Sequence, residues 1–111
     1  MKRIFIELPP FRKYLDALDE GQELLKNLQE TLLESPEAGD LVTGTGGLRK
    51  IRVARQNKGK SGGYRVWYLY VPRSHKVFLL VIYAKNELEN LTMLEKHELK
   101  KLVEKLKAEE R

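Results

Sequence analysis

The stretch GTGGLRKIRVARQNKGKSGGYRVWY, residues 44–68, combines six glycines with seven lysines and arginines and contains no acidic residue. Its residues 48–54 alternate between apolar and basic side chains, and the residues from 64 onward are mostly β-branched or aromatic. Both patterns predict strands, because such side chains suit a pleated, half-buried surface. The polar, glycine-bearing residues 55–63 predict the turn between them. The stretch therefore predicts two antiparallel neighbours in a sheet, joined by a basic loop.

The sequence on either side adds two further strands. Residues 2–8 alternate weakly and end at Pro9, which predicts a strand. Residues 77–84 are apolar throughout, which is typical of a central strand that is covered on both faces. They follow residues 64–71 after the short turn 72–75, so the last three strands are expected to form an antiparallel meander.

Three segments show the apolar periodicity of amphipathic helices. They are residues 9–18, 21–35 and 92–109. Thr92 and Glu95 form a capping box at the start of the last one, and residues 37–47 are predicted to be a loop. The sequence thus predicts one α+β domain over residues 1–111 in the order β-α-α-β-β-β-α. Its sheet would be mostly antiparallel, with an N-terminal helical hairpin and a C-terminal helix.

The positive charge is concentrated in the middle of the chain. Residues 41–86 carry ten lysines and arginines and no acid, whereas the rest of the chain carries eleven cations and sixteen acids. A block of one sign favours a negatively charged partner, and the first candidate is a phosphate backbone. A basic surface that serves only solubility is the alternative reading.

Composition and motifs exclude several classes of function. The chain has no cysteine, which removes disulfides and thiolate metal sites. We find no transmembrane run and no signal peptide, so a cytoplasmic protein without membrane contact is expected. Residues 54–61 resemble a phosphate-binding loop, but a strand follows them and no nearby acid could hold magnesium. His97 is expected to be solvated, and no metal or cofactor is predicted.

Aromatic side chains gather in the two strands that follow the basic loop. Six of the nine aromatic residues lie there: Tyr64, Trp67, Tyr68, Tyr70, Phe78 and Tyr83. Alternation places Tyr64, Tyr68 and Tyr70 on one face, and Arg65 and Trp67 on the other. Trp67, Phe78 and Tyr70 are expected in the core. Tyr68 and Tyr83 could instead be exposed, where a ring beside cations would stack on unpaired bases.

Such a surface could cleave RNA without a metal. The ribose 2′-oxygen would attack the neighbouring phosphorus, and cations would stabilise the negative charge that develops on the phosphate. A lysine among like charges, or a tyrosine, could move a proton.

The sequence also resembles the RelE/ParE superfamily of bacterial toxins, and most closely its HigB branch. The segments SPEAGDLVTGTGGLRKIRVARQNKGKSGGYRVWYLY and FLLVIYAKNELENL, residues 35–70 and 78–91, carry the resemblance. It implies a small α+β toxin that enters the ribosomal A site and cuts the messenger RNA there without a metal. It also implies a cognate antitoxin, often a HigA-like helix-turn-helix protein, in a toxin–antitoxin oligomer.

The resemblance assigns roles to individual residues. Lys50 and Arg52 match the two basic residues that RelE-type members carry on the strand before the loop, and Arg65 matches an arginine that supports phosphate contact. Lys85 and Asn86 fall where RelE members have Lys-Arg, so asparagine replaces one arginine.

The last helix departs from the family pattern. Thr92 falls near the position of a catalytic tyrosine, for which Tyr83 is a candidate substitute on another element.

The first hypothesis is therefore an mRNA endonuclease that depends on the ribosome. Its catalytic set would be Lys50, Arg52, Arg65, Lys85 and Tyr83. Its RNA-docking set would be Arg49, Arg55, Lys58, Lys60 and Tyr68. The alternatives are a ParE-like poison of DNA gyrase that has no nuclease activity, and a non-catalytic RNA-binding protein.

Overall fold

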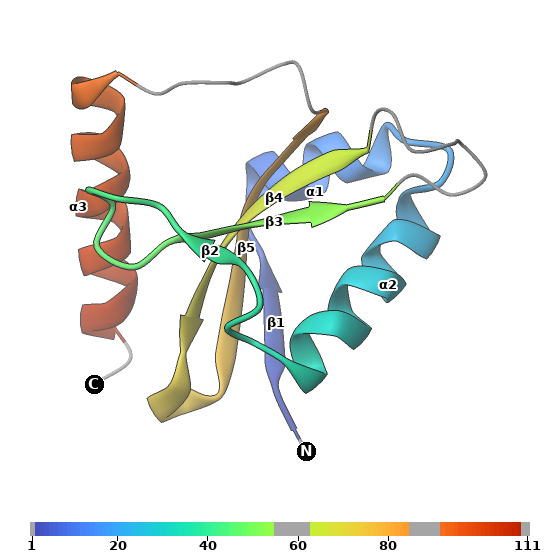
Figure 1. Cartoon of the computed structure of the whole chain (residues 1–111), viewed down its shortest axis with the longest axis horizontal. Helices are drawn as coiled ribbons and strands as arrows, with labels where there is room; N and C mark the ends of the chain where they lie inside the picture. Colours follow the sequence, from blue (N-terminus) through green and yellow to red (C-terminus); the bar gives the residue numbers. More distant parts are fainter. Residues whose placement is uncertain (1, 55–62, 85–91, 110–111) are drawn as a thin grey trace.

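The computed structural model describes residues 2–54, 63–84 and 92–109 of the chain. It forms a five-stranded sheet in the spatial order β1-β5-β4-β3-β2 (Figure 1). The strands are β1 (Ile4–Glu7), β2 (Asp40–Leu41), β3 (Arg49–Val53), β4 (Tyr64–Val71) and β5 (Lys76–Ala84). The helices are α1 (Pro9–Asp16), α2 (Gly21–Glu34) and α3 (Met93–Glu109), and a 3-10 turn η1 (Pro72–Ser74) precedes β5. The predicted α+β fold is confirmed.

The pairing of the strands follows from the connections between them. β3, β4 and β5 form the predicted antiparallel meander. β1 lies parallel to β5 at the edge of the sheet opposite β2. A parallel pair needs a long connection, and here it comprises the helical hairpin and the strands β2, β3 and β4. β5 is therefore an interior strand, as its continuous apolar sequence predicts.

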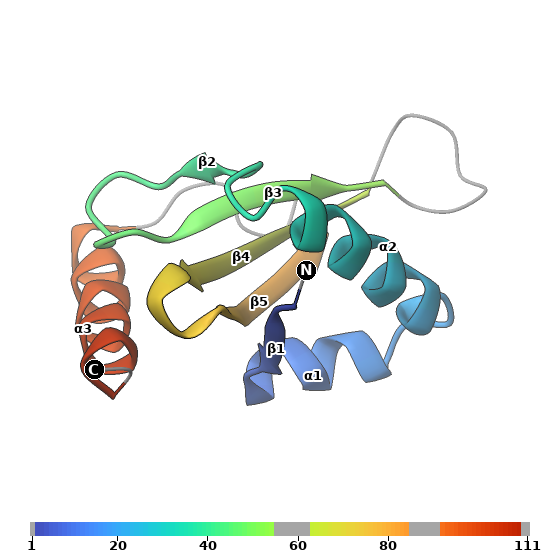
Figure 2. The ribbon, with the colours of Figure 1, turned by 90° about the horizontal axis from the view of Figure 1, so that it is seen from below.

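Helices cover both faces of the sheet, as Figure 2 shows. On one face, Phe11 of α1 and Leu28 of α2 pack with Val66 and Tyr68 of β4. On the other face, Val103 and Leu106 of α3 pack with Trp67, Leu69 and Leu80. The two-sided burial of β4 and β5 explains why these strands are apolar or aromatic at nearly every position.

The capping box at the start of α3 is present. The Thr92 backbone N–H donates to Glu95 Oε1 over 3.0 Å, and the Glu95 backbone N–H donates to Thr92 Oγ1 over 3.1 Å. These bonds satisfy two amides that a helix start would otherwise leave without partners.

Residues 37–47 are not wholly a loop, which corrects the sequence expectation. Asp40 and Leu41 form β2 and pair with Lys50 and Arg49 at the edge of the sheet. A strand of two residues has no periodicity to read, so only the tertiary contacts that hold it reveal it.

Candidate nucleic-acid interface

A cluster of basic side chains lies on the face of the sheet that α3 also occupies. Lys50 is paired with Trp67, and Arg52 with Arg65, across β3 and β4. Trp67 belongs to the core beneath α3, so the alternation of side chains places Lys50, Arg52 and Arg65 on that same face. The structure thus brings together three of the predicted catalytic residues.

Arg52 and Arg65 stand directly opposite each other on adjacent strands. Side chains in such a pair approach within about 5 Å at their Cβ atoms, and like charges there are destabilising. Neither arginine, nor Lys50, forms an ion pair with any residue in the described ranges. An anion bound between the two guanidinium groups would relieve their repulsion.

Arg65 also holds an unused hydrogen-bond donor. Its Nη1 atom is buried and has no hydrogen-bond partner within residues 2–54, 63–84 and 92–109. A buried donor without a partner costs about 1–3 kcal/mol, and more when the group is charged. A phosphate that displaced the groups covering Nη1 would satisfy this donor, because guanidinium and phosphate form strong charge-assisted bonds.

Tyr83 extends the arginine pair by one strand. It pairs with Arg65 across β4 and β5, and the residue is 7% exposed. Its hydroxyl oxygen accepts a 2.8 Å hydrogen bond from Trp67 Nε1, and the two rings meet edge to face with centroids 6.3 Å apart. Trp67 therefore fixes the orientation of the side chain of Tyr83, the residue opposite Arg65. The open question of whether Tyr83 is core or surface is settled largely in favour of the core.

A β-bulge puts Tyr83 on this face. Trp67 pairs with Val81 while Tyr68 pairs with Leu79, so Leu80 has no opposite residue. The extra residue shifts the alternation of β5, and Tyr83 follows Phe78 and Leu80 onto the face of α3. Simple alternation along the sequence would have placed Tyr83 on the opposite face.

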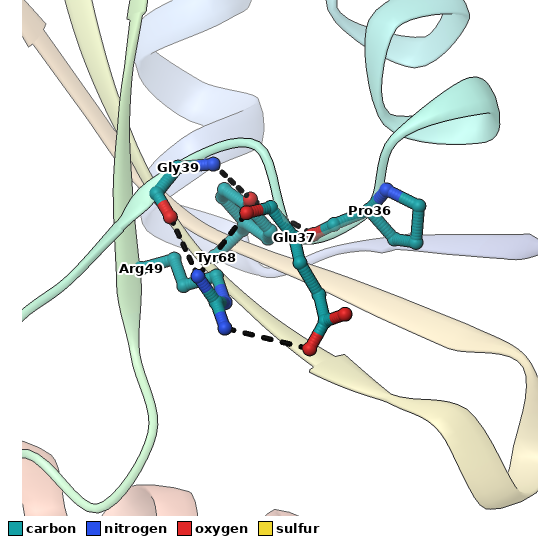
Figure 3. Close-up of polar contacts among 5 residues, drawn as sticks. All are labelled: Pro36, Glu37, Gly39, Arg49 and Tyr68. Atoms are coloured by element: carbon teal, nitrogen blue, oxygen red, sulfur yellow. Dashed lines mark hydrogen bonds and ion pairs between the residues drawn. The ribbon is translucent and has the colours of Figure 1, made fainter.

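Two predicted RNA-docking residues lie elsewhere, which corrects their placement. Tyr68 is fully buried under α1 and α2, and its hydroxyl donates to the Pro36 carbonyl and accepts from the Gly39 amide, each over 2.9 Å (Figure 3). No face of its ring is open to stack on a base. Burial raises the pKa of the Tyr68 hydroxyl above its ordinary value.

Arg49 binds the same segment as Tyr68 and does not belong to the basic surface. Its Nη1 donates to the Gly39 carbonyl over 2.7 Å, and its Nη2 lies 3.5 Å from Glu37 Oε2 (Figure 3). Because it is one residue from Lys50 in a strand, Arg49 points to the other face of the sheet. Arg49 and Tyr68 therefore anchor the segment after α2 and hold β2 beside β3.

The remaining predicted site residues lie outside the described residues. They are Arg55, Lys58, Lys60 and Lys85. Among the described residues, no group of His, Asp or Glu could hold a metal ion, and no helix is long and apolar enough to cross a membrane.

Sequence reasoning misses the role of Trp67. The sequence predicts a core position for this residue, and it lies there, but it also donates the hydrogen bond that positions Tyr83. The signal available in the sequence is its spacing of two residues from Arg65, which places both side chains on one face of β4.

Comparison with known proteins supports the same family. Residues 15–111 match a family model described as the RelE toxin of the RelE/RelB toxin–antitoxin system. Among solved structures, the chain is similar to a free-state mutant of the E. coli toxin RelE, with 26% identity and a TM-score of 0.56. That match covers 74% of this chain and 82% of the other.

Two further similar structures are complexes of toxin and antitoxin. One is the intact E. coli RelBE complex, with 24% identity and a TM-score of 0.55 over 73% of this chain and 94% of that one. The other is the archaeal RelE–RelB complex from Pyrococcus horikoshii, with 20% identity and a TM-score of 0.52 over 78% of this chain and 99% of that one. At these identities the likeness shows the fold.

Proposed function

The chain belongs to the RelE toxin family of toxin–antitoxin systems, and from that premise we propose that it is a metal-independent mRNA endonuclease that acts on the ribosome. One observation carries the proposal. Arg52 and Arg65 face each other without a described carboxylate, and a buried donor of Arg65 has no hydrogen-bond partner among the described residues. Such a pair suits a phosphate, because guanidinium groups form strong charge-assisted hydrogen bonds with phosphate oxygens.

The proposed reaction needs only the RNA and the protein. The ribose 2′-oxygen loses its proton to a base and attacks the adjacent phosphorus, the bond to the 5′-oxygen breaks, and that oxygen takes up a proton. The products are a 2′,3′-cyclic phosphate and a free 5′-hydroxyl. Negative charge grows on the phosphate oxygens during this step, where fixed cations stabilise it most.

Each residue of the interface has a role in this scheme. Arg52 and Arg65 bind the non-bridging oxygens of the scissile phosphate. Lys50, which lies two residues from Arg52 on the same face of β3, and Lys85 add positive charge. Tyr83, held by Trp67, is the proton donor to the leaving 5′-oxygen.

The partners follow from the same premise. Arg55, Lys58 and Lys60 would contact the backbone of messenger or ribosomal RNA. A cognate antitoxin, HigA-like if the chain belongs to the HigB branch, would neutralise the toxin in a toxin–antitoxin complex in the cytoplasm.

The decisive experiment is primer extension on a defined message in cell-free translation, with and without ribosomes. The parent protein should cut only translated message, in register with the codons. Arg65→Ala should lower cutting by about 100-fold or more, because losing one donor to a developing oxyanion costs that much. Arg73→Ala removes an exposed arginine of the same basic block in η1 and should cut like the parent.

Two outcomes would contradict the proposal. One is an Arg65→Ala variant that melts like the parent and cuts at the same rate. The other is an intact message with the parent protein. In that case a loss of DNA supercoiling would favour the gyrase poison, and no effect on either would favour a plain RNA-binding protein.

A further inference from the structure

A second cluster of positive charge lies where α3 meets the loop between β2 and β3. Figure 1 shows this loop lying against α3. A cavity of about 260 Å³ opens there, lined by Thr43, Gly44, Met93, Lys96, His97 and Lys100. The four α3 residues are spaced by three and four, so they share one face of the helix. None of the described residues that line the cavity is a carboxylate.

Glycines allow the loop to approach the lysines closely. Gly44 and Gly46 have φ angles of 83° and 80°, a left-handed conformation that favours glycine. A Cβ atom at Gly44 would lie 3.7 Å from Lys96 Cδ, and one at Gly46 would lie 3.5 Å from Lys100 Cγ. The backbone of the loop therefore already lies beside the stems of both lysines.

The loop is held in place by its own hydrogen bonds and by α3. The buried Thr45 hydroxyl donates to the Val42 carbonyl over 2.7 Å and accepts from the Leu48 amide over 3.2 Å. Lys107 Nζ donates to the Gly46 carbonyl over 2.7 Å. One wall of the cavity is thus formed before any ligand arrives.

The basic residues that line the cavity make no described hydrogen bond that holds the loop, unlike Lys107. Lys96, His97 and Lys100 have no hydrogen-bond or ion-pair partner through their side chains among the residues the structure describes. Lys107 holds the loop, whereas no described residue engages the ammonium groups of Lys96 and Lys100.

From these observations we propose that the cavity is a second anion site, which binds a backbone phosphate of the RNA strand that the protein cleaves. Two ammonium groups, a histidine and the Thr43 hydroxyl are donors suited to a phosphate group. The inference rests on the proposed function and adds a second point of attachment to it.

The position of the cavity would allow one RNA strand to reach both the cavity and the pair of Arg52 and Arg65. Leu48, at the base of the loop, and Arg52 belong to the same run of extended chain and face the same side of the sheet. At about 3.3 Å per residue, they are about 13 Å apart. Thr43 and Gly44, which line the cavity, precede Leu48 in the loop. A phosphate in the cavity would therefore belong to another nucleotide than the scissile one.

The test uses a short single-stranded RNA with 2′-O-methyl sugars, which cannot be cut through the 2′-oxygen. Its affinity is measured by fluorescence anisotropy over a range of salt concentrations. Replacing Lys96 and Lys100 together by alanine should weaken binding about tenfold. The slope of log affinity against log salt should become shallower by about 0.7, because the variant neutralises one phosphate fewer.

The control pair is Lys101→Ala with Lys105→Ala. It removes the same charge from exposed positions on the other side of α3 and should change affinity less than about twofold. Equally weakened binding by both pairs would overturn the proposal, because the lysines would then act only as diffuse charge. Unchanged RNA affinity with weaker binding of a polyglutamate peptide would overturn it in favour of an acidic protein partner.

The result is separable from the proposed nuclease activity, since the modified RNA is never cleaved. Selective loss of binding by the Lys96 and Lys100 pair supports the anion site even if the parent protein leaves messages intact. Conversely, a parent protein that cuts translated message while this pair binds RNA normally would overturn the anion site alone.

Discussion

Arg49 and Lys50 are adjacent in sequence and both basic, yet they belong to different parts of the molecule. Arg49 braces the Gly39 carbonyl and Glu37 on the face of α1 and α2, whereas Lys50 lies on the face of α3 beside Trp67. The period of two along a strand separates them. At the scale of single residues, the side of the sheet decides whether a cation is structural or free to bind a ligand.

The Tyr68 hydroxyl should contribute measurably to stability. Tyr68→Phe leaves the Gly39 amide and the Pro36 carbonyl without their partner, and we expect the free energy of unfolding to fall by about 1–3 kcal/mol. Tyr70→Phe makes the same change on the same face, at a hydroxyl without a described hydrogen bond, and should cost less than about 0.5 kcal/mol. Urea denaturation measures both.

The effect of Tyr68 should also depend on pH. The pKa of Tyr68 is raised in the folded state, so the neutral hydroxyl is favoured there. Its contribution is complete below the unfolded value of about 10 and is lost as the pH rises through the higher folded value. The stability difference between parent and Tyr68→Phe should therefore shrink in alkaline solution. A difference that grows there would contradict this assignment.

At the scale of elements, the segment between α2 and β3 is shaped by one close approach. Gly39 lies against the Tyr68 ring, and an added Cβ would be 2.9 Å from the Tyr68 hydroxyl oxygen and 3.0 Å from the Lys50 carbonyl oxygen. A glycine is needed here for space. This close approach lets β2 reach the edge of the sheet and pair with β3.

Gly39→Ala should therefore destabilise the protein and loosen β2. We expect the free energy of unfolding to fall by about 1–3 kcal/mol, as for other overpacked sites, with faster hydrogen exchange at residues 40 and 41. Ala38→Ser, at the exposed neighbouring position, should stay within about 0.5 kcal/mol of the parent. Equal free energies of unfolding for Gly39→Ala and the parent would contradict this prediction, because the segment between α2 and β3 would then accommodate the added methyl group without a loss of stability.

At the scale of the whole molecule, the sheet separates a structural side from a charged side. The helical hairpin covers one face and α3 lies on the opposite face (Figure 2). The face of α3 also carries Lys50, Arg52 and Arg65. The ten cations of residues 41–86 thus do not all belong to one binding surface, because Arg49 is hydrogen-bonded to the Gly39 carbonyl on the other face.

RNA binding should depend on which face carries the charge. Arg52→Gln with Arg65→Gln should make the salt dependence of 2′-O-methyl RNA binding shallower by about 0.7, because the two arginines bind one phosphate. Lys13→Gln with Lys26→Gln removes the same charge from exposed positions of α1 and α2 and should leave the slope nearly unchanged. Identical slopes for the two double variants would show that net charge alone governs binding.

The sequence by itself determined the α+β order of elements apart from β2, the antiparallel meander, the approximate ends of the helices and the basic face of β3. These features depend on local periodicity, turn chemistry and charge, which are written along the chain. Only the tertiary structure decided that Tyr68 is buried, that β2 exists, and that the Leu80 bulge turns Tyr83 toward Arg65. Those outcomes depend on contacts between distant segments, where register and packing set which side of each residue faces the core.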